Sequence, residues 1–137
     1  MSVVNSLQIL DGSTCRHLTI LLYSEIEKKN ISFDWSMLHA AAKRLQGMLE
    51  TKYGVTLGYR FNDPSIYGVW SNKFQLDIEH YEAVGLVITN PPKLSVTPEG
   101  YDLLQFPGRW ILGKKFGNVD ELTNNIRSTC VNVVKAK

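Results

Sequence analysis

Apolar residues recur at helical spacing in the first half of the sequence, where they predict two helices. The first runs from a cap at Ser13 to about Asn30. The second starts at Asp34 or Ser36 and stops at Gly54, because glycine commonly follows the last turn of a helix. The stripes on one face of these helices are Cys15, Leu18, Leu22 and Ile26 in the first and Leu38, Ala41, Leu45, Met48 and Lys52 in the second.

The pattern changes to alternation and short runs in the middle of the chain. Residues 55–62 alternate as a strand does, and a turn follows at 62–65. Ser71 can cap a third helix that ends at Gly85. Two short strands, at 86–88 and 94–96, then flank a tight connection at residues 90–93.

The remaining third of the chain predicts two more helices. Thr97-Pro98-Glu99 has the order of a cap, a proline in the first helical position and an acid in the first turn, so a short helix should reach about Gln105. Two glycine-rich breaks are expected around Trp110, within 106–118. A last helix is expected from Asp120 to about Val134, with an apolar stripe of Val119, Leu122, Ile126, Cys130 and Val133.

These elements predict one α+β domain over residues 1–137, mostly helical, with a small antiparallel sheet and an extra C-terminal helix. The composition agrees, because 44% hydrophobic and 20% charged residues are ordinary for a globular protein. The first ten residues lack the features of a signal peptide, and no apolar run approaches the roughly 20 residues of a membrane span. We therefore expect a cytoplasmic protein that does not enter membranes.

A helix followed directly by a two-stranded hairpin, as predicted for residues 67–100, is the second half of a winged helix. Three pieces of this segment are informative: Tyr67-Gly68-Val69-Trp70-Ser71, Gly85-Leu86-Val87 and Thr97-Pro98-Glu99-Gly100. They resemble the small winged-helix regulators, and Panacea-type domains found beside toxins in particular, although Val69 replaces the proline of that family. The resemblance implies a degenerate winged-helix domain. Residues 54–70 depart from it, because a compact helix-turn-helix joins its helices through about three to four residues.

A helical projection divides the third helix into faces. Trp70, Phe74, Ile78 and Tyr81 form an apolar side expected in the core, and Asn72, Gln75, Glu79 and Glu82 form a polar side. A second apolar pair, Leu76 and Ala83, lies opposite the core side, and we expect it to be buried against the first or the last helix.

The resulting function hypothesis is a regulator of transcription that binds duplex DNA. The amides of Asn72 and Gln75 suit adenine, while Lys73 and Lys93, the latter at the hairpin tip, can reach phosphates. A symmetric DNA reader needs two half-sites, so the hypothesis includes a homodimer formed through the C-terminal helix. Glu79 and Glu82 count against DNA binding, since they would repel a phosphate backbone.

A protein-interaction module on the same scaffold, antitoxin-like or viral accessory, is the alternative. Its support is the long connection and the acidic segment 71–108, which carries two lysines against five acids. Residues 109–137 carry six basic residues against two acidic ones, and the chain as a whole has a formal net charge of +2, too small to indicate nucleic acid by itself.

The sequence does not predict an enzyme, a metal site or a cofactor. His17, His39 and His80 are scattered, and the lysines of 113–117 lack the spacing of a phosphate-binding loop. Cys15 and Cys130 stand too far apart in sequence for a zinc motif, so we expect two buried thiols without a disulfide.

Overall fold

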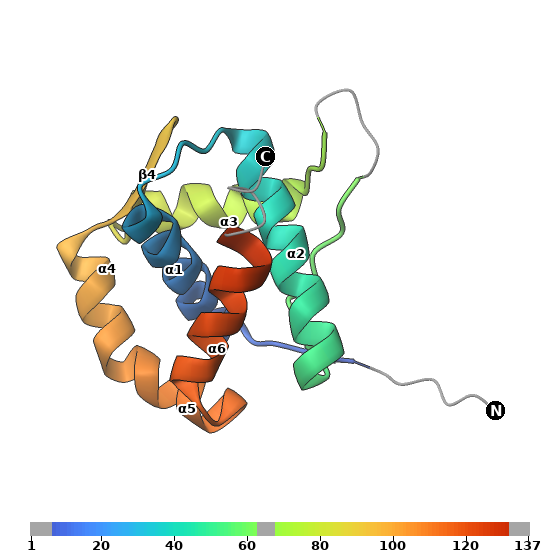
Figure 1. Cartoon of the computed structure of the whole chain (residues 1–137). Coiled ribbons are helices and arrows are strands. Elements are labelled where there is room, and N and C mark those ends of the chain that lie inside the picture. The colour runs from blue at the N-terminus through green and yellow to red at the C-terminus, as the bar shows by residue number, and fades with distance from the viewer. Residues whose placement is uncertain (1–6, 63–67, 132–137) are drawn as a thin grey trace.

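The computed structural model describes residues 7–62 and 68–131, and within them the chain is mostly helical with a small antiparallel sheet (Figure 1). The helices are α1 (Gly12–Lys29), α2 (Trp35–Tyr53), α3 (Asn72–Ala83), α4 (Pro98–Leu103), α5 (Arg109–Phe116) and α6 (Val119–Ile126). The strands are β1 (Gln8–Ile9), β2 (Val55–Thr56), β3 (Val87–Asn90) and β4 (Lys93–Val96). Two short segments follow α4 and α6: η1 (Leu104–Gly108), which is kinked at Phe106, and η2 (Arg127–Val131), a π-helical turn.

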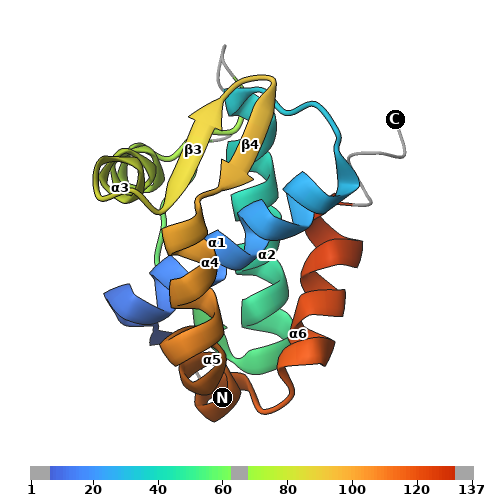
Figure 2. The same cartoon turned by 90° about the vertical axis from the view of Figure 1, so that its left-hand side faces the viewer.

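Helix α1 is the centre of the fold. It contacts β4, α4, α5, α6, η1 and η2, so it is buried on more than one side. Leu18, Ile20 and Leu22 are all without exposed surface, although they point in different directions from the helix. Figure 2 shows α1 and α2 between α3 with the hairpin on one side and α6 on the other.

Helix caps were predicted well because they depend on neighbours in sequence. The carboxylate of Asp34, one of the two expected starts, accepts from Met37 N at 2.8 Å, and Ser71 Oγ accepts from Phe74 N at 3.2 Å. Gly54 ends α2 with a φ of 69°. The cap at Ser13 was wrong: α1 begins at Gly12, because Asp11 accepts from Thr14 N.

The strand predicted over 55–62 was also wrong in extent. Only Val55 and Thr56 form a strand, and it pairs in parallel with β1. Gly58 has a φ of 82°, which breaks the extended conformation. Beyond it the side-chain amide of Gln46 accepts from Tyr59 N at 2.8 Å and donates to Tyr59 O at 2.9 Å. These bonds occupy the groups that a neighbouring strand would otherwise pair.

The hairpin of β3 and β4 is antiparallel, with Asn90 opposite Lys93 at its tip. Its turn is attached to the rest of the domain, because Phe33 N donates to Pro92 O at 2.9 Å. The start of α4 packs closely on the start of the hairpin: Thr97 Oγ1 donates to Gly85 O at 2.6 Å, and a side chain at Gly100 would collide with the carbonyl group of Leu86. The Thr-x-x-Gly sequence therefore has a local packing role here.

The C-terminal third is more helical than predicted. Trp110 lies in α5, and the two expected breaks flank this helix: a kink at Phe106, whose φ of −156° and ψ of 124° are not helical, and a turn at Gly117. Gly113 is accommodated inside α5. Helix α6 starts at Val119, with Asn118 as its cap. The predicted stripe is buried where α6 and η2 pack on α1 and α2, since no surface is exposed at Leu122, Ile126 and Cys130. Val133 lies outside the described residues. The stripe is thus covered within one chain, which removes the sequence-based reason for a homodimer through this helix.

One ion pair joins the two ends of the fold. The side chain of Glu25 in α1 is only 1% exposed, and its Oε1 accepts from Arg127 Nε at 2.8 Å. Its other oxygen is 3.3 Å from Lys28 Nζ. A buried carboxylate needs such partners, so η2 supplies part of what α1 requires to be stable.

Candidate functional site

The structure does not bring the four predicted DNA-binding residues into one cluster. Asn72, Lys73 and Gln75 lie in the first turn of α3. Lys93 begins β4 and lines a small hollow with Ile26 and Asn30 near the C-terminal end of α1. The helix and the hairpin tip therefore present separate groups.

Both amides that could read bases are engaged within the chain. Asn72 Oδ1 accepts from Trp70 Nε1 at 3.1 Å. His39 Nδ1 accepts from Ser71 N at 3.0 Å, so its Nε2 carries the proton and donates to Gln75 Oε1 at 2.9 Å. Gln75 Nε2 in turn donates to Glu79 Oε2 at 3.2 Å. Reading a base would require these side chains to exchange partners.

His39 was not predicted as part of this region. It is fully buried, and its ring stacks on Trp70 with centroids 3.8 Å apart and planes 12° from parallel. Burial lowers the pKa of His39, and the hydrogen bond with Gln75 only partly opposes that effect. The imidazole is therefore a neutral connector between the cap of α3 and the middle of α2.

The core side of α3 was predicted correctly, and on its polar side Asn72 and Glu79 are exposed as expected. Phe74, Ile78 and Tyr81 are buried, and Trp70 is half-buried against His39. The expectation that Leu76 and Ala83 would be buried against another helix was wrong, because both are exposed. The first and last helices lie elsewhere: α1 packs on the inner side of the hairpin, and α6 lies on the far side of α1 and α2 (Figure 2).

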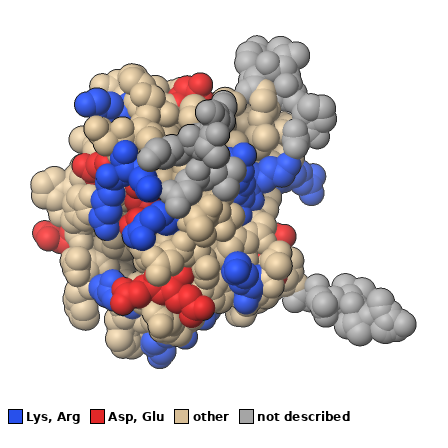
Figure 3. All heavy atoms as spheres, in the orientation of Figure 1, with Lys and Arg blue, Asp and Glu red and all other residues tan. Residues whose placement is uncertain are grey.

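Charge on the surface is mixed. Figure 3, in the orientation of Figure 1, shows basic and acidic side chains interspersed on that face without a continuous positive stripe. On α3 itself Lys73 is paired with Asp77 at 2.8 Å, and Glu79 is exposed. Glu82 has a structural role, since its Oε2 accepts from Thr89 N at 2.7 Å and attaches β3 to α3.

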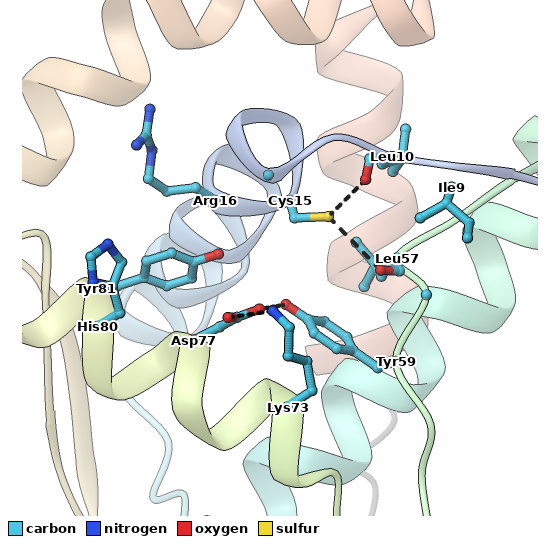
Figure 4. Close-up of a pocket in the computed structure, with 12 residues that line it drawn as sticks. Ile9, Leu10, Cys15, Arg16, Leu57, Tyr59, Lys73, Asp77, His80 and Tyr81 are labelled. Atoms are coloured by element: carbon cyan, nitrogen blue, oxygen red, sulfur yellow. Dashed lines mark hydrogen bonds and ion pairs between the residues drawn. The ribbon is translucent and has the colours of Figure 1, made fainter.

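A cavity of about 470 Å³ lies between the start of α1, residues 57–59 and α3 (Figure 4). Its apolar lining includes Ile9, Leu10 and Leu57, and its polar lining is Arg16, Tyr59, Lys73, Asp77, His80 and Tyr81. The carboxylate of Asp77 links two of the walls, because it accepts from Tyr59 Oη at 2.6 Å as well as from Lys73. This hollow was not anticipated from the sequence, since its residues are distant along the chain.

The cavity is unsuited to nucleophilic chemistry through its cysteine. Burial, with a further contribution from the negative charge of Asp77, raises the pKa of Cys15 to about 11. Its thiol points toward the carbonyl groups of Leu10 and Leu57, at 3.8 and 4.0 Å. Burial and Asp77 also raise the pKa of Tyr81.

Residues 7–62 and 68–131 contain no group of three or more histidine, cysteine, aspartate or glutamate side chains placed to hold a metal ion. None of the helices in those ranges has the length and apolar character needed to cross a bilayer.

Tyr67, part of the winged-helix resemblance, lies outside the described residues. Comparisons with protein-family models, with curated proteins and with solved structures found no match to this chain.

Proposed function

We propose that this domain is a protein-interaction module on a winged-helix-like scaffold, and that a partner protein docks on the outer face of α3 and β3. The observation that carries the proposal is a set of exposed apolar side chains, Leu76, Ala83, Val84 and Ile88, which we call the apolar face. Leu76 is 61% exposed, Val84 53% and Ile88 49%. Large apolar side chains exposed on one helix and its adjoining strand mark a surface that a partner covers.

The position of Leu76 favours protein over DNA. It lies at the middle of the solvent side of α3, opposite the core residues Phe74, Ile78 and Tyr81. In a winged helix this side of the third helix would enter the major groove, where polar side chains meet base edges. Here it presents a leucine at its centre, and the neighbouring amides are bonded within the chain.

Charge indicates the chemistry of the partner. Glu79, one turn from Leu76, is exposed, and its carboxylate accepts a hydrogen bond from the amide of Gln75. Segment 71–108 has more acidic than basic residues. A partner that presents apolar side chains bordered by lysine or arginine would complement this face. The resemblance to domains found beside toxins agrees with an antitoxin-like role.

The test uses the purified chain as bait in extracts of its own source cells, followed by reconstitution with the captured protein. Hydrogen exchange in the purified pair should show protection over residues 72–90, and Leu76→Asp should weaken binding by at least about tenfold. Trp110→Asp is the matched control, because Trp110 is 60% exposed on α5 but is not part of the apolar face. Equal losses for both variants, or protection confined to other elements, would contradict the proposal.

A winged-helix regulator that binds duplex DNA is the second candidate. The order of α3, β3 and β4 favours it, and Lys73 and Lys93 are exposed. Binding would weaken as salt rises, with a log–log slope of about 0.9 per phosphate neutralised, and Lys73→Ala or Lys93→Ala would each lower that slope by about one. Salt-dependent retention of a duplex by the wild type and by Leu76→Asp alike would support this candidate and contradict the first.

A further inference from the structure

Two tryptophans that are distant in the sequence line one hollow at the surface of the domain. Trp35 is the first residue of α2, and Trp70 immediately precedes Ser71, the cap of α3. A Cβ atom at Gly68 would lie 2.7 Å from Ser36 Oγ, so the chain that leads into α3 lies against the start of α2. The hollow has a volume of about 700 Å³, within the roughly 300–1,000 Å³ typical of small-molecule sites. Its described lining is Asp34, Trp35, Ser36, Trp70 and Asn72.

Trp70 is held in place with one face of its ring directed away from the core. The inner face stacks on His39, which is fully buried, with centroids 3.8 Å apart and planes 12° from parallel. The indole Nε1 donates to Asn72 Oδ1 at 3.1 Å, so the polar edge of the ring already has its acceptor. Because His39 covers the inner face and Trp70 is half-exposed, the outer face of the ring is the surface that Trp70 presents to the hollow.

The charge at the hollow is negative. Asp34 lines it and is exposed, and in residues 7–62 and 68–131 no lysine or arginine forms an ion pair with this carboxylate. Its Oδ1 accepts from Met37 N at 2.8 Å, which keeps the side chain at the start of α2. Burial lowers the pKa of His39, so the ring behind Trp70 is neutral at about pH 7 and does not repel a cation. A ligand with a positive charge therefore complements this site.

We propose that the hollow binds a small quaternary ammonium compound, whose methylated cation lies over the outer face of Trp70 and against Trp35, with Asp34 as its counter-charge. The face of an aromatic ring is electrically negative, and tryptophan attracts cations more strongly than the other aromatic side chains do. The methyl groups of a quaternary ammonium pack on aromatic walls, whereas a simple ammonium group is strongly hydrated and brings donors that these walls cannot satisfy. The site shares no described residue with the apolar face, so it goes beyond the protein-docking role proposed above and does not depend on it.

The experiment compares the binding of choline, dimethylbutanol and ethanolamine to the full chain by titration in ¹H–¹⁵N NMR spectra. The dimethylbutanol is the uncharged analogue of choline with carbon in place of nitrogen, and ethanolamine has the charge without the methyl groups. We expect choline to bind at least about fivefold more tightly than either. The chain has three tryptophans, and the indole N–H signals of Trp35 and Trp70 should shift while that of Trp110, on α5, stays in place. Equal affinity for choline and dimethylbutanol, or a shift at Trp110 alone, overturns the proposal.

A peptide that carries trimethyllysine presents the same cation on a protein side chain. We expect it to bind no more tightly than choline, because the proposed ligand is a free small molecule. Tighter binding of the peptide would assign the hollow to a modified protein partner and would overturn the small-molecule proposal.

Variants locate the charge and the ring. Asp34→Asn should weaken the binding of choline by about threefold and leave that of dimethylbutanol unchanged, since asparagine still caps α2 but carries no charge. Asp11→Asn is the matched control, because Asp11 caps α1 in the same way and does not line the hollow. Trp35→Leu should remove most of the preference for choline over dimethylbutanol, whereas Trp110→Leu should retain it. A full preference in folded Asp34→Asn and Trp35→Leu would refute the assignment.

Discussion

Replacing Phe74 by alanine tests how α3 is attached to the domain. Phe74 is 1% exposed, and its ring makes edge contacts with His39 and Tyr59 at centroid distances of 5.0 and 5.4 Å. Burial of a phenylalanine side chain contributes about 1.5–3 kcal/mol, and each aromatic pair adds about 0.5–1.5 kcal/mol. The ring is surrounded by a cap network that cannot easily collapse into the space it leaves. We therefore expect a loss of roughly 3–5 kcal/mol in the free energy of unfolding.

Urea unfolding followed by circular dichroism measures this loss at constant temperature and pH. Leu76→Ala is the matched control two residues away: Leu76 is 61% exposed, so its replacement should change stability by less than about 0.5 kcal/mol. Glu82→Ala should fall between them, because it leaves Thr89 N without its acceptor. Equal losses for Phe74→Ala and Leu76→Ala would refute the assignment of the two faces.

Three further predictions follow from buried polar groups. Arg127→Met should lower the free energy of unfolding by about 3 kcal/mol. Glu25→Gln should lower it less, because only Arg127→Met leaves a buried carboxylate without its arginine. Equal losses for the two variants in urea unfolding would contradict this. Folding lowers the pKa of His39 from 6.5, so in acid the unfolded chain binds more protons than the folded chain does. The free energy of unfolding should therefore be constant above about pH 6.5 and fall as the pH drops below it. If His39→Gln has the same dependence of unfolding free energy on pH as the wild type, His39 is not the cause. Cys15, with a pKa of about 11, should react with iodoacetamide at about pH 7.5 far more slowly than free cysteine does, and mass spectrometry showing rapid labelling of the folded chain would contradict its burial.

The features that the sequence predicted correctly depend on residues close together in the chain. The caps at Asp34, Ser71 and Thr97 were correct, because each depends on a side chain that bonds a backbone group three residues away. The two breaks expected around Trp110 are present at Phe106 and Gly117, but the helix α5 between them was not predicted, because its buried residues Leu112 and Phe116 make contacts that are distant in sequence.

Residues that meet only in the folded chain could not be found this way. The strand predicted over 55–62 failed because Gln46, on another element, bonds the backbone of Tyr59. The exposure of Leu76 likewise depends on where α1 and α6 pack.

The pairing of Glu25 with Arg127 has a consequence for synthesis on the ribosome. The two residues are separated by 102 positions, so at about 5–20 residues per second the glutamate is made roughly 5 to 20 s before its arginine. During that interval the nascent chain also lacks Leu122, Ile126 and Cys130, which cover α1 and α2. The emerging protein therefore carries an uncovered apolar helix in which Glu25 has Lys28 but lacks Arg127. Such a chain is a natural client for chaperones, and it should resist proteases only once η2 has been translated.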